Sequence, residues 1–281
     1  MNKFLPSLTA LLALAGGSAF AADLPVAPVY RGPPPAYVPS PAYNFSGCYI
    51  GGNAGGMWEH DTTTITLNDP TDIATPAFLA GAIPNGFNYD RSSWLAGGQI
   101  GCNYQVTNWL LGLETDFDGT NLIGGQTINT AVPGFLASTS TVTQNMDWIG
   151  TARGRFGMVW NNVLLYSTGG LAYGHVRNSY SFNNVVGGGT VSIASSDEPT
   201  QFGWTVGGGL EVGFGNWSVK GEALYYDLGS HTLSAPCTVV GGAACAGPNT
   251  TFFSTSENKG VIARAGVNYR FDWFSPVAAR Y

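Results

Sequence analysis

Near its C-terminus the chain reads VIARAGVNYRF over residues 261–271. Every second position of this stretch is apolar or aromatic: Val261, Ala263, Ala265, Val267, Tyr269 and Phe271. Arg264, Asn268 and Arg270 lie between them. Because side chains alternate between the two faces of a β-strand, one face is apolar and the other carries both arginines. A single strand of this kind fits a soluble β-sandwich as well as a membrane barrel. Only the recurrence of the pattern along the chain can distinguish these two folds.

The same alternation recurs along the chain and predicts eight strands. Their spans are residues 45–58, 92–106, 109–120, 142–160, 163–177, 200–214, 217–229 and 257–271. Tight turns are predicted at Thr107-Asn108, Asn161-Asn162 and Gly215-Asn216. Long external loops are predicted for residues 59–91, 121–141, 178–199 and 230–256. Short periplasmic turns opposite long loops, with aromatic residues at strand ends, predict an all-β fold, an eight-stranded antiparallel transmembrane up-and-down β-barrel.

The N-terminus predicts export. Lys3, an apolar run from Leu8 to Ala15 and the A-x-A motif ending at Ala21 are typical of a cleaved signal peptide over residues 1–21. Residues 22–43 are rich in proline and are predicted to form an extended periplasmic leader, either a spacer or a ligand for an aromatic groove. The barrel is predicted over residues 44–271, followed by a C-terminal tail, residues 272–281. The predicted location is the outer membrane.

Composition agrees with a membrane barrel. Charged residues make up 10% of the chain, against about 25% in ordinary soluble domains. The 40 glycines suit a strongly curved sheet, where they allow bends and close strand approach. A net charge of −6 and the lack of any lysine or arginine cluster argue against a nucleic-acid partner. The expected surroundings are outer-membrane lipids and lipopolysaccharide.

The alternation assigns a face to each strand residue. Those predicted to face lipid include Trp148, Phe156, Trp160, Trp204, Val206, Leu210, Val212, Phe214, Trp217, Val219, Ala223 and Tyr225. The opposite face collects acids and bases: Glu114, Asp116, Arg153, Arg155, Glu211, Lys220, Glu222, Arg264 and Arg270. Side chains fill the interior of so narrow a barrel, so we interpret these residues as a mutually neutralising lumen network. A selectivity filter is the alternative.

Four cysteines suit an oxidising compartment. If Cys48 lies opposite Cys102, the first two strands pair so that Trp58 lies near Ser92, and both cysteines fall on the outward face. The two alternatives for this pair are a cross-strand disulfide and two free thiols that face lipid. Cys237 and Cys245 share the last predicted loop, and a disulfide is predicted between them.

The sequence predicts no catalytic residues, metal site or cofactor. His60, His175 and His231 are scattered, no cysteine–histidine spacing suits zinc, and neither a P-loop nor a dinucleotide fingerprint occurs. His60 and Asp61 could indicate a lipid-modifying enzyme. Neighbours on one strand point to opposite faces, however, which argues against a catalytic pair. The protein is therefore predicted not to be an enzyme.

Four motifs carry a family resemblance. They are FSGCYIGGN at residues 45–53, GGQIGCNY at 97–104, TARGRFG at 151–157 and AGVNYRF at 265–271. In their order and spacing the chain resembles the small outer-membrane immunogenic proteins of alphaproteobacteria, also called porin-family outer-membrane β-barrel proteins. The resemblance covers the mature barrel. It departs from the family pattern at Cys48 and Cys102, where many relatives carry a hydrophobic residue, and in the tail that runs past Phe271 to Tyr281.

The resemblance implies an abundant eight-stranded surface antigen that serves envelope integrity or surface contact. It carries no catalytic residues, and it implies recognition of the last strand by the barrel-assembly machinery. We therefore predict a structural barrel with a narrow, packed lumen. The alternatives are porin-like passage of small solutes and haem binding at the external loops, with His60 or His231 as axial ligand.

Overall fold

The computed structural model describes residues 43–69, 75–186, 189–236, 238–240 and 250–271. Contacts divide the chain into two units, residues 1–40 and 41–281. The first unit lies outside the described residues, so the account below concerns the second. The predicted signal peptide, the leader up to residue 42, the tail and the predicted disulfide partners Cys237 and Cys245 also lie outside them.

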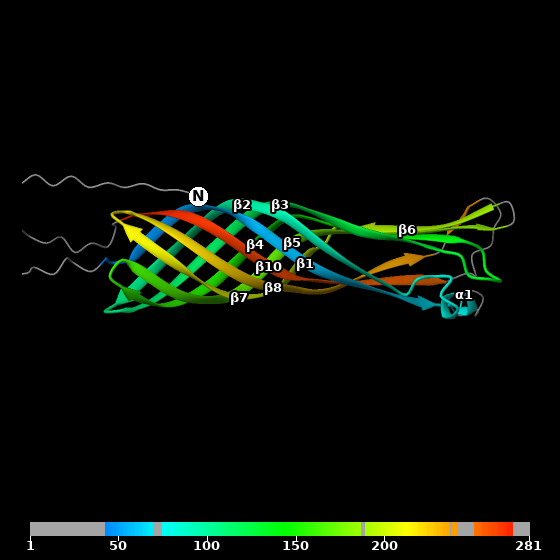
Figure 1. The fold of residues 1–281 in the computed structure, drawn as a ribbon, viewed down its shortest axis with the longest axis horizontal. Coiled ribbons are helices and arrows are strands. Elements are labelled where there is room, and N and C mark those ends of the chain that lie inside the picture. Colours follow the sequence, from blue (N-terminus) through cyan, green and yellow to red (C-terminus); the bar gives the residue numbers. More distant parts are fainter. Residues whose placement is uncertain (1–42, 70–74, 187–188, 237, 241–249, 272–281) are drawn as a thin grey trace, which may run out of the picture. The chain divides into compact units, whose positions relative to one another are not determined.

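Eight antiparallel strands close into a ring (Figure 1). They are β1 (Gly47–Asn68), β2 (Gly86–Val106), β3 (Trp109–Thr130), β4 (Ser138–Trp160), β5 (Val163–Val186), β7 (Thr200–Phe214), β8 (Trp217–Pro236) and β10 (Thr251–Phe271). The pairing order is β4-β3-β2-β1-β10-β8-β7-β5, and β5 pairs with β4 to close the ring. The predicted eight-stranded up-and-down barrel is therefore confirmed.

Two further strands lie beyond the ring proper. β6 (Gly189–Asp197) pairs with β5 over residues 178–186, directly past the segment of β5 that pairs with β7. β9 (Thr238–Val240) pairs with β6. Glu198 and Pro199 separate β6 from β7, and proline cannot donate a ladder hydrogen bond. β6 is therefore the continuation of β7 beyond a break.

The prediction of long external loops is wrong for most of their length. Residues 59–68, 86–91, 121–130, 138–141, 178–186, 230–236 and 251–256 continue the strands, and the one described helix, α1 (Thr75–Leu79), is short. Figure 1 shows these strands running well past the ring toward β6 and α1. An apolar cluster inside this extension, which includes Ile65, Phe87, Tyr180, Phe182 and Phe252, supplies the burial that holds these segments as strands.

The turns and the first register agree with the sequence. Thr107-Asn108, Asn161-Asn162 and Gly215-Asn216 are two-residue turns, and the first residue of each has a positive φ of 54–59°. Such turns match the twist of the strands they join. β1 and β2 pair with Cys48 opposite Cys102 and Trp58 opposite Ser92, which is the register considered from the sequence for this cysteine pair. We call this end of the barrel the turn end and the opposite end the far end.

The outward face carries a belt of exposed apolar side chains. Members include Ile50, Ile100, Leu113, Phe156, Val206, Leu210 and Val267. Aromatic side chains border the belt at the turn end, for example Trp109, Trp160, Phe214 and Trp217, and toward the far end at Trp58, Trp94, Phe117 and Trp204. An apolar band between two aromatic girdles is the arrangement expected of a transmembrane barrel. No helix within the described ranges is long and apolar enough to cross a membrane.

The interior is layered. An apolar cluster of Phe45, Leu110, Val159, Leu164 and Tyr166 fills the turn end, with Tyr43 packed against it. A second apolar cluster lies further along and includes Met57, Leu95, Leu122, Met146, Ile149 and Ile262. The third is the cluster in the extension. Charged side chains occupy the two levels between these apolar layers.

Candidate functional site

The central charge cluster lies between the first two apolar layers. β3 contributes Glu114, Asp116 and Asp118, β4 contributes Arg153 and Arg155, β7 contributes Glu211, β8 contributes Lys220 and Glu222, and β10 contributes Arg264. On β3, β4 and β8 these residues recur at a spacing of two, and the inward face of the pleat holds them together with Glu211 and Arg264. Their side chains are 0–3% exposed. Five strands thus bring five acids and four bases into one closed interior.

Arg153 and Arg264 share the acids at the far side of this cluster. Arg153 lies 2.6 Å from Glu114, 2.7 Å from Asp116 and 3.1 Å from Glu222. Arg264 lies 2.7 Å from both Asp116 and Glu222 and also pairs with Asp118. Each guanidinium therefore bridges carboxylates from different strands. Planar, forked donors suit this bridging better than a lysine ammonium does.

Arg155 and Lys220 neutralise the acids nearer the turn end. Arg155 donates to Glu211 and to the Tyr49 hydroxyl at 2.6 Å each, and its guanidinium carbon lies 4.1 Å from the centroid of the Tyr166 ring. Lys220 donates to Glu114 at 2.8 Å. Buried charges of this kind are tolerated only when hydrogen-bonded partners surround them. The cluster fixes the relative positions of distant strands.

Eight of the nine predicted lumen residues lie in this cluster. The ninth, Arg270, lies nearer the turn end and is partly exposed, with its guanidinium carbon 4.9 Å from the centroid of the Tyr43 ring. Asp118 was not among the predicted residues. Asp118 follows Asp116 by two residues on the same strand, so the alternation of side chains already placed it on the inward face.

A second charge cluster, Glu59, Asp61, Arg91 and Tyr226, was missed because its three charged residues lie in the segment 59–91 that was predicted as a loop. Arg91 pairs with both Glu59 and Asp61, and the Tyr226 hydroxyl donates to Glu59. The outward residues of β1 change from Trp58 to His60 at this level, so the cluster lies just past the aromatic girdle. One guanidinium here faces two buried carboxylates.

Burial has the largest effect on the pKa values of Glu59 and Asp61. It raises the pKa of Glu59 to about 7 and raises the pKa of Asp61, although Arg91 opposes both shifts. Desolvation disfavours a carboxylate, and the single arginine compensates it only in part. The folded protein therefore keeps a proton on this cluster at a pH where an unfolded chain has lost it.

We expect a proton to leave Glu59 as the pH rises through about 7. Difference infrared spectroscopy of the refolded protein should show a protonated carboxyl band that disappears over this range and is missing from Glu59→Gln. Because the folded pKa lies above the ordinary value of 4.5, this group should lower stability as the pH rises from about 4.5 to about 7. A carboxyl band with its midpoint near 4.5 would contradict the prediction.

Cys48 and Cys102 form a disulfide between β1 and β2. Of the two alternatives, a cross-strand disulfide and two free thiols, the structure therefore contains the disulfide. It lies on the outward face beside Ile50, Ile100 and Leu113, within the apolar belt. Water-soluble reagents reach this depth poorly.

The position of this disulfide predicts resistance to reduction in the folded state. In a Cys237→Ser/Cys245→Ser background, a charged phosphine should reduce Cys48–Cys102 slowly in lipid vesicles and quickly after heating in dodecyl sulfate. Maleimide labelling followed by a mobility shift would measure both rates. Equal rates in the two states would show that lipid does not cover the bridge.

The three histidines lie apart. His60 Nδ1 lies 2.6 Å from Asp90 on the outward face, His231 Nε2 lies 2.5 Å from Asp197, and His175 stacks on Trp148. His60 points outward whereas Asp61 is buried, as their parity predicts. Within the part of the chain that the structure describes, no group of three or more His, Cys, Asp or Glu residues could hold a metal ion.

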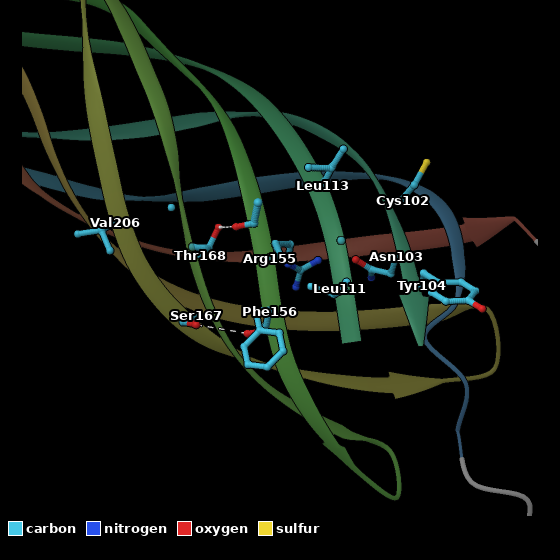
Figure 2. Close-up of a pocket in the computed structure, with 13 residues that line it drawn as sticks. Cys102, Asn103, Tyr104, Leu111, Leu113, Arg155, Phe156, Ser167, Thr168 and Val206 are labelled. Atoms are coloured by element: carbon cyan, nitrogen blue, oxygen red, sulfur yellow. Dashed lines mark hydrogen bonds between the residues drawn. The ribbon is translucent and has the colours of Figure 1, made fainter. Parts of the chain in front are cut away.

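An apolar groove of about 800 Å³ runs across the outward face of β2, β3, β4, β5 and β7 (Figure 2). Its lining includes Leu113, Phe156 and Val206, and Gly154 and Gly169 form part of it. Figure 2 shows the Ser167 hydroxyl directed at the backbone of Phe156, to which it donates at 3.4 Å. Since this groove lies within the apolar belt, lipid chains are its natural occupants.

The chain is similar to several known outer-membrane proteins. The 31 kDa outer-membrane immunogenic protein of Brucella melitensis is 28% identical over 270 residues, which cover 94% of this chain and 98% of the relative. The 22 kDa outer membrane protein of Rhizobium leguminosarum bv. viciae is 34% identical over 129 residues, 45% of this chain and 49% of the relative. The crystal structure of OprG from Pseudomonas aeruginosa matches with a TM-score of 0.40 and 10% identity, covering 80% of this chain and 96% of OprG.

The model of the outer membrane protein beta-barrel domain matches residues 8–271. This match spans all strands of the ring. It also agrees with the closed antiparallel ring, the apolar belt and the aromatic girdles. The chain belongs to the family of outer membrane β-barrel proteins.

Proposed function

We propose that this protein is a structural, non-catalytic barrel whose closed lumen anchors a rigid β extension for contact at the cell surface. The observation that carries the proposal is the layered interior. Three apolar layers and two charged layers alternate along the barrel, and the charged side chains of the central layer are 0–3% exposed. Packing of this kind supports a lumen without a water-filled path.

The extension supports the surface role. The strands continue beyond the far aromatic girdle and enclose their own apolar cluster. In this class the short turns face the periplasm, so the extension faces outward from the cell. A packed β extension presents a fixed surface, unlike mobile loops. This suits envelope contact and recognition as an antigen.

Two molecular partners follow from this role. The outward belt contacts outer-membrane lipids, and we propose lipopolysaccharide as the lipid of the outer leaflet. We also propose that the barrel-assembly machinery recognises β10, the last strand, which alternates apolar and polar residues up to Phe271. No observation favours haem over these partners, because His60 and His231 are both engaged by carboxylates.

Planar-bilayer recording tests the closed lumen. We expect the purified, heat-modifiable protein to insert without stepwise conductance, under conditions in which a 16-stranded porin, whose lumen holds a water channel, conducts. Insertion would be verified by protease protection of the same preparation. Conductance steps that scale with salt concentration would overturn the packed lumen and favour porin-like passage of small solutes.

A further inference from the structure

Beyond the level of His60 and Asp90, the described outward positions of the extension carry no charged side chain. These residues, called the neutral surface below, are the outward positions of residues 62–68, 88, 121–129, 139–145, 179–183, 192–196, 232–236 and 251–255. Most of them are Thr, Ser or Asn, and none is Asp, Glu, Lys or Arg. A surface exposed to water ordinarily carries roughly 25–35% charged residues, which keep it soluble. The neutral surface therefore suits a different medium.

The charges lie in a narrow band just below this surface. Asp90, Asp147, Glu198, Asp227 and Glu257 stand near the far aromatic girdle with Arg177, Lys259 and His60, and several pair with one another at 2.6–3.7 Å. A headgroup layer is polar and ionic, so this band lies where charge is best solvated. The neutral surface continues from the band away from the membrane by seven or more residues on β1 and β3, roughly 20–30 Å of strand.

Cross-strand hydrogen bonds arrange the polar groups of the neutral surface. Thr62 donates to Asn88 at 3.1 Å, Thr139 donates to Asn129 at 2.7 Å and Ser192 donates to Asn183 at 2.9 Å. Hydroxyl pairs add to the array: Thr127 with Thr141 at 3.0 Å, and Thr232 with Thr255 at 2.9 Å.

These bonds leave donors and acceptors for an external partner. All three asparagines accept through their carbonyl oxygens, so within the described chain their N–H₂ groups remain for a partner outside it. The threonine hydroxyls in these bonds can accept as well as donate, namely those of Thr62, Thr139, Thr127, Thr141, Thr232 and Thr255. The surface thus offers many neutral hydrogen-bond donors and acceptors in rows along the strands. This pattern matches the hydroxyl groups of a sugar chain. It does not favour phosphate, because it has no cationic side chain.

We propose that the neutral surface is the contact face for the polysaccharide of the outer-leaflet lipopolysaccharide. The inference rests on the proposed outward orientation of the extension and on lipopolysaccharide as the proposed outer-leaflet lipid, and it is independent of whether the lumen conducts. The face follows the lipid-facing belt along the same strands, just beyond the band of charges, so a sugar chain that extends outward from the lipid headgroups meets it. The contact is broad and made of many weak hydrogen bonds, each worth little by itself. It does not require a sugar-specific pocket.

Hydrogen–deuterium exchange of the full protein tests the proposal in two membranes. One contains lipopolysaccharide with its polysaccharide, and the other contains lipid A alone. Peptides covering residues 121–145 should exchange roughly three- to tenfold more slowly in the first membrane, the effect of a few net hydrogen bonds on local opening. Peptides from residues 47–56, inside the belt, should exchange equally in both. Equal exchange of residues 121–145 in the two membranes would overturn the proposal.

A matched pair of variants separates hydroxyl contact from mere shape. Thr127→Val/Thr141→Val keeps β-branched side chains but removes one outward hydroxyl pair, and it should lose most of the polysaccharide-dependent slowing near that pair. Thr115→Val removes an outward hydroxyl of the same strand within the lipid belt and should keep the slowing. Slowing that persists fully in the double variant would refute the hydroxyl contact. Slowing that instead grows with protein density in lipid A membranes would assign the face to a second copy of the chain.

Discussion

Replacing Arg155 with leucine should lower the free energy of unfolding by about 3–5 kcal/mol, the usual cost of leaving a buried charge without its partner. Arg155 is fully buried and pairs with Glu211 at 2.6 Å while donating to Tyr49. Without it, the carboxylate of Glu211 retains only the neutral donors Ser218 and Asn268. Urea unfolding in detergent or vesicles, followed by gel mobility, would measure the change.

The double variant Arg155→Leu/Glu211→Leu provides the control. It removes both charges together, so it should be more stable than Arg155→Leu, since replacing a buried pair by apolar residues is often neutral. Arg177→Leu, which removes a half-exposed arginine from the outward face, should change the unfolding midpoint little. If Arg155→Leu unfolds at the wild-type urea concentration, the central cluster does not stabilise the barrel.

The ring and the two faces were predictable because a β-strand has a period of two. The inward arginines at 153 and 155 and the inward acids at 114 and 116 follow from parity alone. Parity also places Asp118 inward, although it was left out of the predicted network. These features are local, so a single sequence contains them.

The partners across the lumen could not be predicted in the same way. Arg155 and Glu211 are 56 residues apart and meet across the interior, and their level depends on the stagger of every intervening strand pair. Parity gives the face of each residue but not its height in the barrel. The sequence therefore predicts which charges point inward and leaves their pairing open.

The extension was misread because its residues look like loop residues. Thr, Ser, Asn and Gly dominate, and apolar residues such as Ile65, Ile193 and Leu233 are widely spaced. No single strand there has a strong apolar face. The strands persist because many of them each add one or two side chains to a shared apolar cluster and because each ladder continues from the barrel below. Such support is tertiary and does not appear in any local pattern.

Arginine at position 267 should destabilise the barrel by about 2–4 kcal/mol, because the side chain would be placed against lipid near the membrane midplane. Val267 is 45% exposed on the outward face of β10, midway between Val261 and Phe271, which lie on the same face.

The matched control is Thr255→Arg. Thr255 lies on the same face of the same strand. It is roughly 40 Å away from Val267 along the strand, beyond the aromatic girdle at the far end. Arginine is solvated there, so this variant should fold and insert as the wild type does. Urea unfolding in vesicles, read by heat-modifiable mobility, compares the two directly. Equal stability of both variants would mean that β10 does not face lipid at Val267, whereas a large loss at 267 alone sets the depth of the membrane along the strand.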